Sequence, residues 1–160
     1  MKKELIILHE DKIWVRKRIT ELEKAIQELG PEFYDVFNQS SETWHDNAPF
    51  DALRDRQSVL DAELQQLKSV LRSGLLEVPK QKEGITGIGS RVTLEDEGGT
   101  RSQYLVAGDW TPYAGQIKNG ALVISAQAPL AQQLLGKKVG DQMKIGSKIA
   151  KIVKIRHNLK

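Results

Sequence analysis

The sequence contains no cysteine, which excludes disulfide bonds and cysteine-ligated zinc sites. Histidine is also scarce, and His9, His45 and His157 are too scattered to predict a metal site or a catalytic triad. No apolar run approaches the roughly 20 residues that cross a bilayer, and the run at 5–8 is too short for a signal peptide. We therefore expect a cytoplasmic protein with no membrane partner.

Enzyme signatures are missing as well. The sequence has no GxxxxGK[ST] phosphate-binding loop, no GxGxxG between a strand and a helix, and no GxSxG nucleophile motif. The composition, with 39% hydrophobic and 28% charged residues, is that of an ordinary globular protein. The residues therefore carry no signature of a known enzyme class.

The net charge of +3 conceals an asymmetry between the two halves. Residues 1–75 carry 11 Lys/Arg against 14 Asp/Glu, whereas residues 76–160 carry 13 against 7. The last 25 residues alone hold eight basic side chains and one acid. Such an excess attracts nucleic acid or an acidic protein surface. The plainer alternative is the solvated face of ordinary strands, and the alternation in residues 150–157 fits it well.

The first half has helical periodicity. Its seam positions recur three and four residues apart, as a coiled coil requires: Leu5, Leu8, Lys12, Val15, Ile19, Leu22, Ile26 and Leu29. We expect Gly30-Pro31 to break or kink this helix. A second seam follows at Leu53, Gln57, Leu60, Leu64, Leu67 and Leu71. Residues 1–75 are therefore predicted to form an antiparallel coiled-coil hairpin.

The connection between the two predicted helices, SSETWHDNAP, spans residues 40–49. Helices of about 25 to 35 residues would hold it roughly 40 to 50 Å from the other end of the hairpin. Its carboxylates, Glu42 and Asp46, are the kind of oxygen ligand that Mg²⁺ prefers, usually shared with phosphate or water. The alternative is an ordinary turn in which Asp46 or Asn47 caps the second helix and Pro49 occupies its first turn.

The second half changes period. Residues 76–87 have the glycine and proline content of a linker, and residues 88–160 contain short β-like runs bounded by turn residues. One helical segment, PLAQQLLG, begins at Pro129 and ends at Gly136. The pattern predicts a small antiparallel α+β domain after the hairpin.

Motifs at both ends of the chain resemble the Gre family of bacterial transcription elongation factors. The tip segment is similar to the family pattern at five positions: Asp46, Asn47, Ala48, Phe50 and Arg54. The stretch VISAQAPLAQQLLGKKVGD resembles the family's second domain at Ile124, Ser125, Pro129, Leu130, Leu134, Gly136, Val139, Gly140 and Asp141. The resemblance covers nearly the whole chain and implies an FKBP-like fold for the second domain.

The resemblance also implies a function. Gre factors insert the hairpin into the secondary channel of RNA polymerase, where tip acids help to hold the second Mg²⁺ that cleaves backtracked RNA. Asp46 and Glu42 would be these catalytic, metal-binding carboxylates, with Mg²⁺ bound only in the complex. Residues near the tip would contact RNA or polymerase: Trp44, His45, Asn47, Phe50 and Arg54. The second domain would dock through Ala128, Pro129, Leu130, Lys137 and Lys138.

The implied partners are bacterial RNA polymerase and, indirectly, the 3′ end of the nascent RNA. We expect a monomer. The tip also departs from the family pattern, because Thr43 occupies the position of the first of two acids. Two alternatives therefore stay open: a secondary-channel regulator without cleavage activity, and a coiled-coil adaptor that is unrelated to polymerase.

Overall fold

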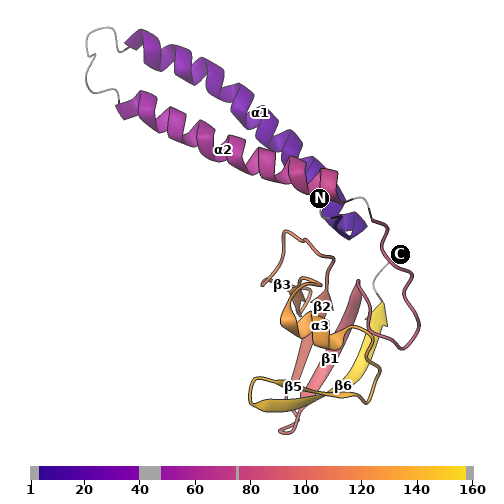
Figure 1. The fold of residues 1–160 in the computed structure, drawn as a ribbon. Coiled ribbons are helices and arrows are strands. Elements are labelled where there is room, and N and C mark those ends of the chain that lie inside the picture. The colour runs from indigo at the N-terminus through magenta and orange to yellow at the C-terminus, as the bar shows by residue number, and fades with distance from the viewer. Residues whose placement is uncertain (1–3, 40–47, 75, 158–160) are drawn as a thin grey trace. The chain divides into compact units, whose positions relative to one another are not determined.

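The computed structural model describes residues 4–39, 48–74 and 76–157. These residues form two compact units (Figure 1). One unit, here called the hairpin, spans residues 12–73. The other, here called the globular unit, combines residues 4–11 with the chain from Gly74 onward. The N-terminal segment thus packs with the second half of the chain, although its apolar residues continue the helical seam in sequence.

The hairpin consists of α1 (His9–Gln39), whose first three residues belong to the globular unit, and α2 (Ala48–Ser73). The two helices run antiparallel, as the sequence predicts (Figure 1). Leucines from both predicted seams are buried, among them Leu22 and Leu29 on α1 and Leu64 and Leu67 on α2. A period of three and four residues places these side chains on one stripe of each helix, so the stripes face each other.

Two details of the first helix differ from the prediction. The helix begins at His9, so Leu5 and Leu8 lie before it. The predicted break at Gly30-Pro31 is wrong, because α1 continues through Pro31 to Gln39. Proline removes one backbone donor from the helix interior. Beyond it, Phe33 still packs edge-on against Phe50 of α2, with ring centroids 5.6 Å apart, and this interhelical contact supports the last turns.

Ion pairs join the outer faces of the two helices. Arg18 makes a bidentate contact with Glu63 at 2.7 and 3.0 Å. Lys68 lies 3.1 Å from Glu23, and Arg56 lies 3.6 Å from Glu32. These pairs cross between helices, so they fix the register of one helix against the other as well as adding charge attraction.

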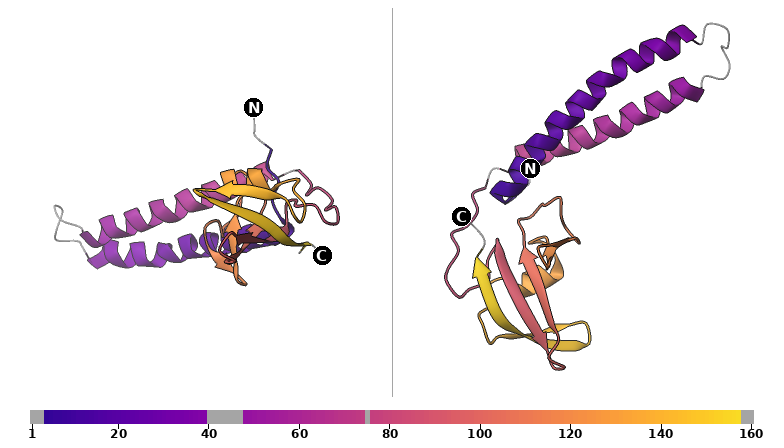
Figure 2. Two further views of the ribbon diagram at one scale, coloured as in Figure 1. Left: turned by 90° about the horizontal axis from the view of Figure 1, so that it is seen from below. Right: turned by 180° about the vertical axis from the view of Figure 1, so that it is seen from behind.

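The globular unit is built on a six-stranded sheet with the order β3-β4-β2-β1-β6-β5. Figures 1 and 2 show its longer strands β2, β1 and β6 side by side. The strands are β1 (Ser90–Asp96), β2 (Arg101–Val106), β3 (Ile117–Lys118), β4 (Ala121–Ile124), β5 (Gln142–Ile145) and β6 (Lys148–His157). One short helix, α3 (Pro129–Leu134), follows β4. The α+β class predicted from the sequence is confirmed.

The sheet is mixed, because β2 and β4 pair in parallel, whereas the sequence predicted an antiparallel domain. A parallel pair requires a long crossover connection, and residues 107–120 supply it. The end of this connection folds back as β3, which pairs with β4 through a tight turn at Asn119 and Gly120. Both turn residues have positive φ, at 50° and 80°, as a two-residue type I′ turn requires.

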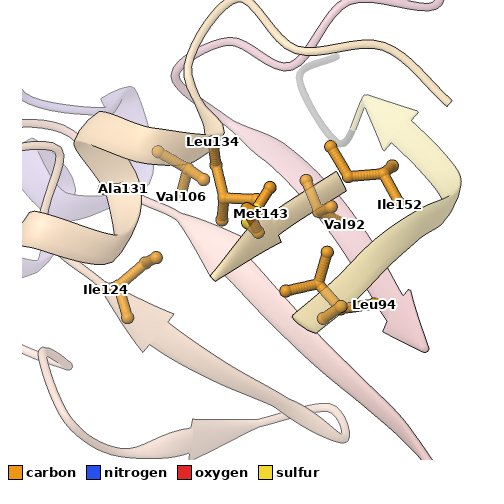
Figure 3. Packing of buried hydrophobic residues seen from close by; sticks show 9 residues of the cluster. Val92, Leu94, Val106, Ile124, Ala131, Leu134, Met143 and Ile152 are labelled. Carbon is orange, nitrogen blue, oxygen red and sulfur yellow. The ribbon is translucent and has the colours of Figure 1, made fainter. Parts of the chain in front are cut away.

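The main hydrophobic core lies on one face of the sheet, beneath α3 (Figure 3). Its members come from α3 and from every strand except β3: Val92, Leu94, Val106, Ile124, Ala131, Leu134, Met143, Ala150 and Ile152. Strand residues alternate between the two faces, so Val92 and Leu94 point into this core while Arg91 and Thr93 point to the opposite face.

The N-terminal segment is held by backbone and side-chain contacts. The Ile6 N–H donates to Asp109 Oδ2 at 2.8 Å, and the Asp109 N–H donates to the Ile6 carbonyl at 2.7 Å. Gly108 makes this approach possible, since a Cβ there would collide with the Ile6 carbonyl oxygen. Leu8 then packs into a second small cluster with Ala107 and Val123.

The predicted linker is also tied to the sheet. His157, at the end of β6, bridges the Ser90 hydroxyl at 2.9 Å and the Lys82 carbonyl oxygen at 2.8 Å. The Gln81 side chain donates to the Ile88 carbonyl oxygen at 2.9 Å. These contacts explain why the segment after Gly74 belongs to the globular unit.

Candidate functional site

The far end of the hairpin is the first candidate site. There the Phe33–Phe50 contact keeps the helices paired close to the point where their connection begins. Pro49 occupies the first turn of α2, as the sequence predicts. Phe50 is half-buried, whereas Arg54, one turn further along α2, is exposed. The end of the hairpin opposite to Lys12 and Ser73 is therefore formed by the last turns of α1 up to Gln39 and the first turns of α2 from Ala48.

Most of the predicted tip residues lie outside the described part of the chain. These are Glu42, Trp44, His45, Asp46 and Asn47, together with Thr43. Within residues 4–39, 48–74 and 76–157, no group of three or more histidine or acidic side chains is arranged to hold a metal ion. The Mg²⁺ site at Asp46 and Glu42 accordingly stays a prediction.

The predicted docking residues form the second candidate site. Ala128 precedes α3 with an extended backbone, and Pro129 opens the helix with an exposed ring. Ala128 and Leu130 are half-buried and pack against the main core. The core beneath α3 thus fixes the position of a short surface that begins at Pro129.

The lysine turn follows α3 directly. The Lys138 N–H donates to Asp141 Oδ2 at 2.8 Å, and the Lys137 carbonyl accepts the Thr86 N–H at 2.8 Å. Both lysine side chains are exposed, and next to them Val139 is 55% exposed. The chain directly after α3 therefore exposes both basic and apolar side chains. Val139, which the sequence matched to the Gre pattern without a docking role, is one of them.

A buried acid at the start of α1 was missed by the sequence analysis. Asp11 is only 4% exposed, and burial raises its pKa to about 6. A hydrogen bond from Thr111 and the charge of Lys118 lower this pKa, while Glu10 raises it. Asp11 Oδ2 has no hydrogen-bond partner among the residues that the structure describes. Lys118 itself pairs with Glu10 at 3.3 Å and lies 4.6 Å above the Tyr113 ring.

No described helix combines the length and apolar character needed to cross a membrane.

Comparison with known proteins gives a consistent result. Residues 81–157 match the family model described as "Transcription elongation factor, GreA/GreB, C-term". The transcription elongation factor GreA of Geobacillus kaustophilus is 28% identical over 119 residues, covering 69% of this chain and 71% of that protein. GreA of Mesoplasma florum is 27% identical over 150 residues, covering 91% and 90%. Among solved structures, GreA factor homolog 1 of Thermus thermophilus aligns over 96% of this chain and 99% of its own, with 19% identity and a TM-score of 0.44.

Proposed function

Because this chain belongs to the Gre family of transcription elongation factors, we propose that it binds bacterial RNA polymerase and stimulates cleavage of backtracked RNA. The observation that carries the proposal is the combination of a GreA/GreB-type second half with an antiparallel hairpin in front of it. A 26-residue α2 is about 40 Å long, which is a reach suited to a narrow channel.

The division of labour follows from the two candidate sites. The surface made by Pro129, Leu130 and the lysine turn docks the globular unit on polymerase, with basic side chains facing acidic partners. The hairpin then carries Asp46 and Glu42 to the polymerase active centre. There one of these carboxylates would help to hold the second Mg²⁺, and the bound metal would supply charge stabilisation for the attacking and leaving oxygens. Polymerase supplies the remaining catalytic groups, so the chain acts as an accessory factor of polymerase and is not itself an enzyme.

Arg54 has a supporting role in this proposal. It lies on α2, eight residues after Asp46 in the sequence, and is exposed, so its guanidinium is available to RNA phosphate oxygens. Phe50 serves a different purpose, because its contact with Phe33 keeps the tip end of the hairpin closed.

The test is a cleavage assay on a stalled, backtracked complex that carries labelled RNA. We expect Mg²⁺-dependent shortening of the RNA, which Asp46→Asn abolishes while binding to polymerase persists. Asp51→Asn is the matched control, since Asp51 is an exposed acid in the first turn of α2 and the substitution makes the same chemical change, and it should leave cleavage unchanged. Absence of binding to core polymerase at micromolar protein would refute the proposal.

The second candidate function is a secondary-channel regulator without cleavage activity. The specific observation in its favour is Thr43, which stands where the family pattern has the first of two tip acids. Under this alternative the protein still binds polymerase but leaves backtracked RNA intact. The same assay separates the two functions, and Thr43→Glu should then introduce cleavage.

A further inference from the structure

A group of basic side chains gathers on the sheet face that is opposite to the main core. Arg91 of β1 stands directly across from Arg156 of β6. Thr93, two residues along β1, stands between Lys154 of β6 and Gln103 of β2. These five residues line one hollow of about 210 Å³, which we call the basic trough.

The trough continues into a neighbouring hollow of about 520 Å³ that shares Thr93, Gln103 and Lys154. Arg101 and Ser102 lie on its polar side, and Ile117 and Leu122 contribute apolar walls. Among the described residues that line the two hollows, none is acidic and none is aromatic. All five residues of the trough can donate hydrogen bonds, and three of them carry a positive charge.

The charges of the trough are not balanced within the described chain. Like charges placed directly opposite on adjacent strands destabilise a sheet, and Arg91 and Arg156 are such a pair. Neither of them, nor Lys154, forms an ion pair with any residue that the structure describes. Further along β1 a basic side chain is balanced, because Arg101 of β2 forms an ion pair with Glu95 of β1 at 3.1 Å. An external anion would relieve the repulsion in the trough.

Arg91 is also held in a fixed position. Its Nη1 donates to the Asn119 carbonyl oxygen at 2.6 Å and to Gln103 Oε1 at 3.3 Å. Both contacts are made by Nη1, so a guanidinium with five N–H donors keeps further donors for a ligand. A cation that is already oriented loses less conformational entropy when it binds a ligand.

We propose that the basic trough binds the sugar-phosphate backbone of double-stranded DNA. Guanidinium forks match phosphate oxygens, and a duplex presents such oxygens at regular spacing whatever its sequence. The lack of lining aromatic side chains argues against single strands, which bind chiefly by stacking their bases on such rings. An acidic protein segment would need several carboxylates in one particular arrangement, whereas a phosphate backbone repeats its charge along its length.

This binding is independent of polymerase, so it is tested with the full chain alone. The probe is a fluorescently labelled 20-base-pair DNA duplex, titrated by anisotropy at several salt concentrations. We expect a Kd on the order of 10⁻⁵ M at low salt, and a log–log salt slope of about −3 for three phosphate contacts. Arg156→Glu should weaken binding about tenfold and reduce the slope by about 1.

The variant is chosen so that folding is preserved. A glutamate at position 156 would face Arg91 and replace a like-charge pair by an ion pair, so the melting temperature should stay constant or rise. Lys144→Glu is the matched control, because Lys144 is an exposed residue of β5 that lines neither hollow. It makes the same charge change, and we expect less than about a twofold loss of affinity.

Three results would overturn the proposal. The first is equal DNA binding by Arg156→Glu and Lys144→Glu. The second is tighter binding of a single strand of the same sequence than of the duplex. The third is a polyglutamate peptide that displaces the duplex at a lower concentration than unlabelled duplex does, which would assign the trough to an acidic protein segment.

Discussion

The hairpin and the globular unit achieve their structures by different means. The hairpin has a narrow seam of leucines, and three ion pairs between its helices add to it. The globular unit has a sheet with a core on one face and a second small cluster around Leu8. Two helices alone bury little apolar surface per residue, so the ion pairs between them supplement the leucine seam. The two units therefore differ in how much of their stability comes from a buried core.

The largest expected effect breaks the globular unit and leaves the hairpin intact. Leu94 is 2% exposed within the main core. Leu94→Ala removes buried methyl groups and leaves a cavity, so the free energy of unfolding of this unit should fall by about 3 kcal/mol. Urea denaturation followed by tryptophan fluorescence in a Trp14→Phe, Trp44→Phe background, where Trp110 of the globular unit is the remaining tryptophan, measures the loss.

Far-UV dichroism provides the other half of that experiment, because the long helices of the hairpin dominate its helical signal. We expect the helical transition to stay where it is in the parent protein. Ile149→Ala is the control, since Ile149 is 44% exposed and its truncation should cost less than about 1 kcal/mol. A helical transition that moves together with the aromatic one would contradict the separation of the two units.

A smaller effect concerns the acid at the start of α1. The folded-state pKa of Asp11, about 6, lies above the ordinary value of 3.8, so the folded state binds this proton more tightly than the unfolded state. The resulting stability is fully present below pH 3.8 and is lost as the pH rises through 6, by at most about 3 kcal/mol. Asp11→Asn should remove this contribution, because its side chain stays neutral throughout.

The measurement is the difference in unfolding free energy between the parent and Asp11→Asn at a series of pH values. Using the difference cancels the titration of the other acids. We expect the variant to gain stability over the parent between pH 4 and 7. Since Lys118 and Thr111 both favour the charged form of Asp11, a flat difference would mean that these partners fully offset its burial.

How much of the fold the sequence predicts depends on how local the cause is. The strand SRVTLED is found at Ser90–Asp96 because alternation within seven residues encodes it. The strand Ile117–Lys118 escaped prediction because two residues carry no period. The parallel pairing of β2 with β4 was likewise invisible, since it depends on the path of residues 107–120.

The candidate sites follow the same rule. Local patterns indicated both the docking surface, around Pro129 and the lysine turn, and the tip, between two seams, and the roles of these residues stay predictions. Asp11 was not predictable, because an acid in the first turn of a helix ordinarily faces water. Its burial comes from Thr111 and neighbouring residues about a hundred positions away, and nothing in residues 9–15 indicates them.

The smallest effect tests whether charge placement specifies the hairpin. Arg18 and Glu63 make a bidentate pair across the two helices, which raises the pKa of Arg18 and lowers the pKa of Glu63, in both cases mainly through the hydrogen bond between them. Both side chains are about one-third exposed, at 36% and 35%, so solvent screens the attraction. A double-mutant cycle with Arg18→Ala and Glu63→Ala should therefore give a coupling energy of about 0.5 to 1 kcal/mol. Because the pKa of Glu63 is lowered on folding, the coupling should be present above pH 4.5 and disappear as the pH falls further.

A parallel cycle on Lys24 and Glu28, an exposed pair within α1 at 3.9 Å, should give about half the coupling energy of the Arg18–Glu63 pair or less. Equal coupling in the two cycles would mean that the interhelical pair adds no more than an ordinary surface pair, and the hairpin's register would then rest on its leucine seam alone.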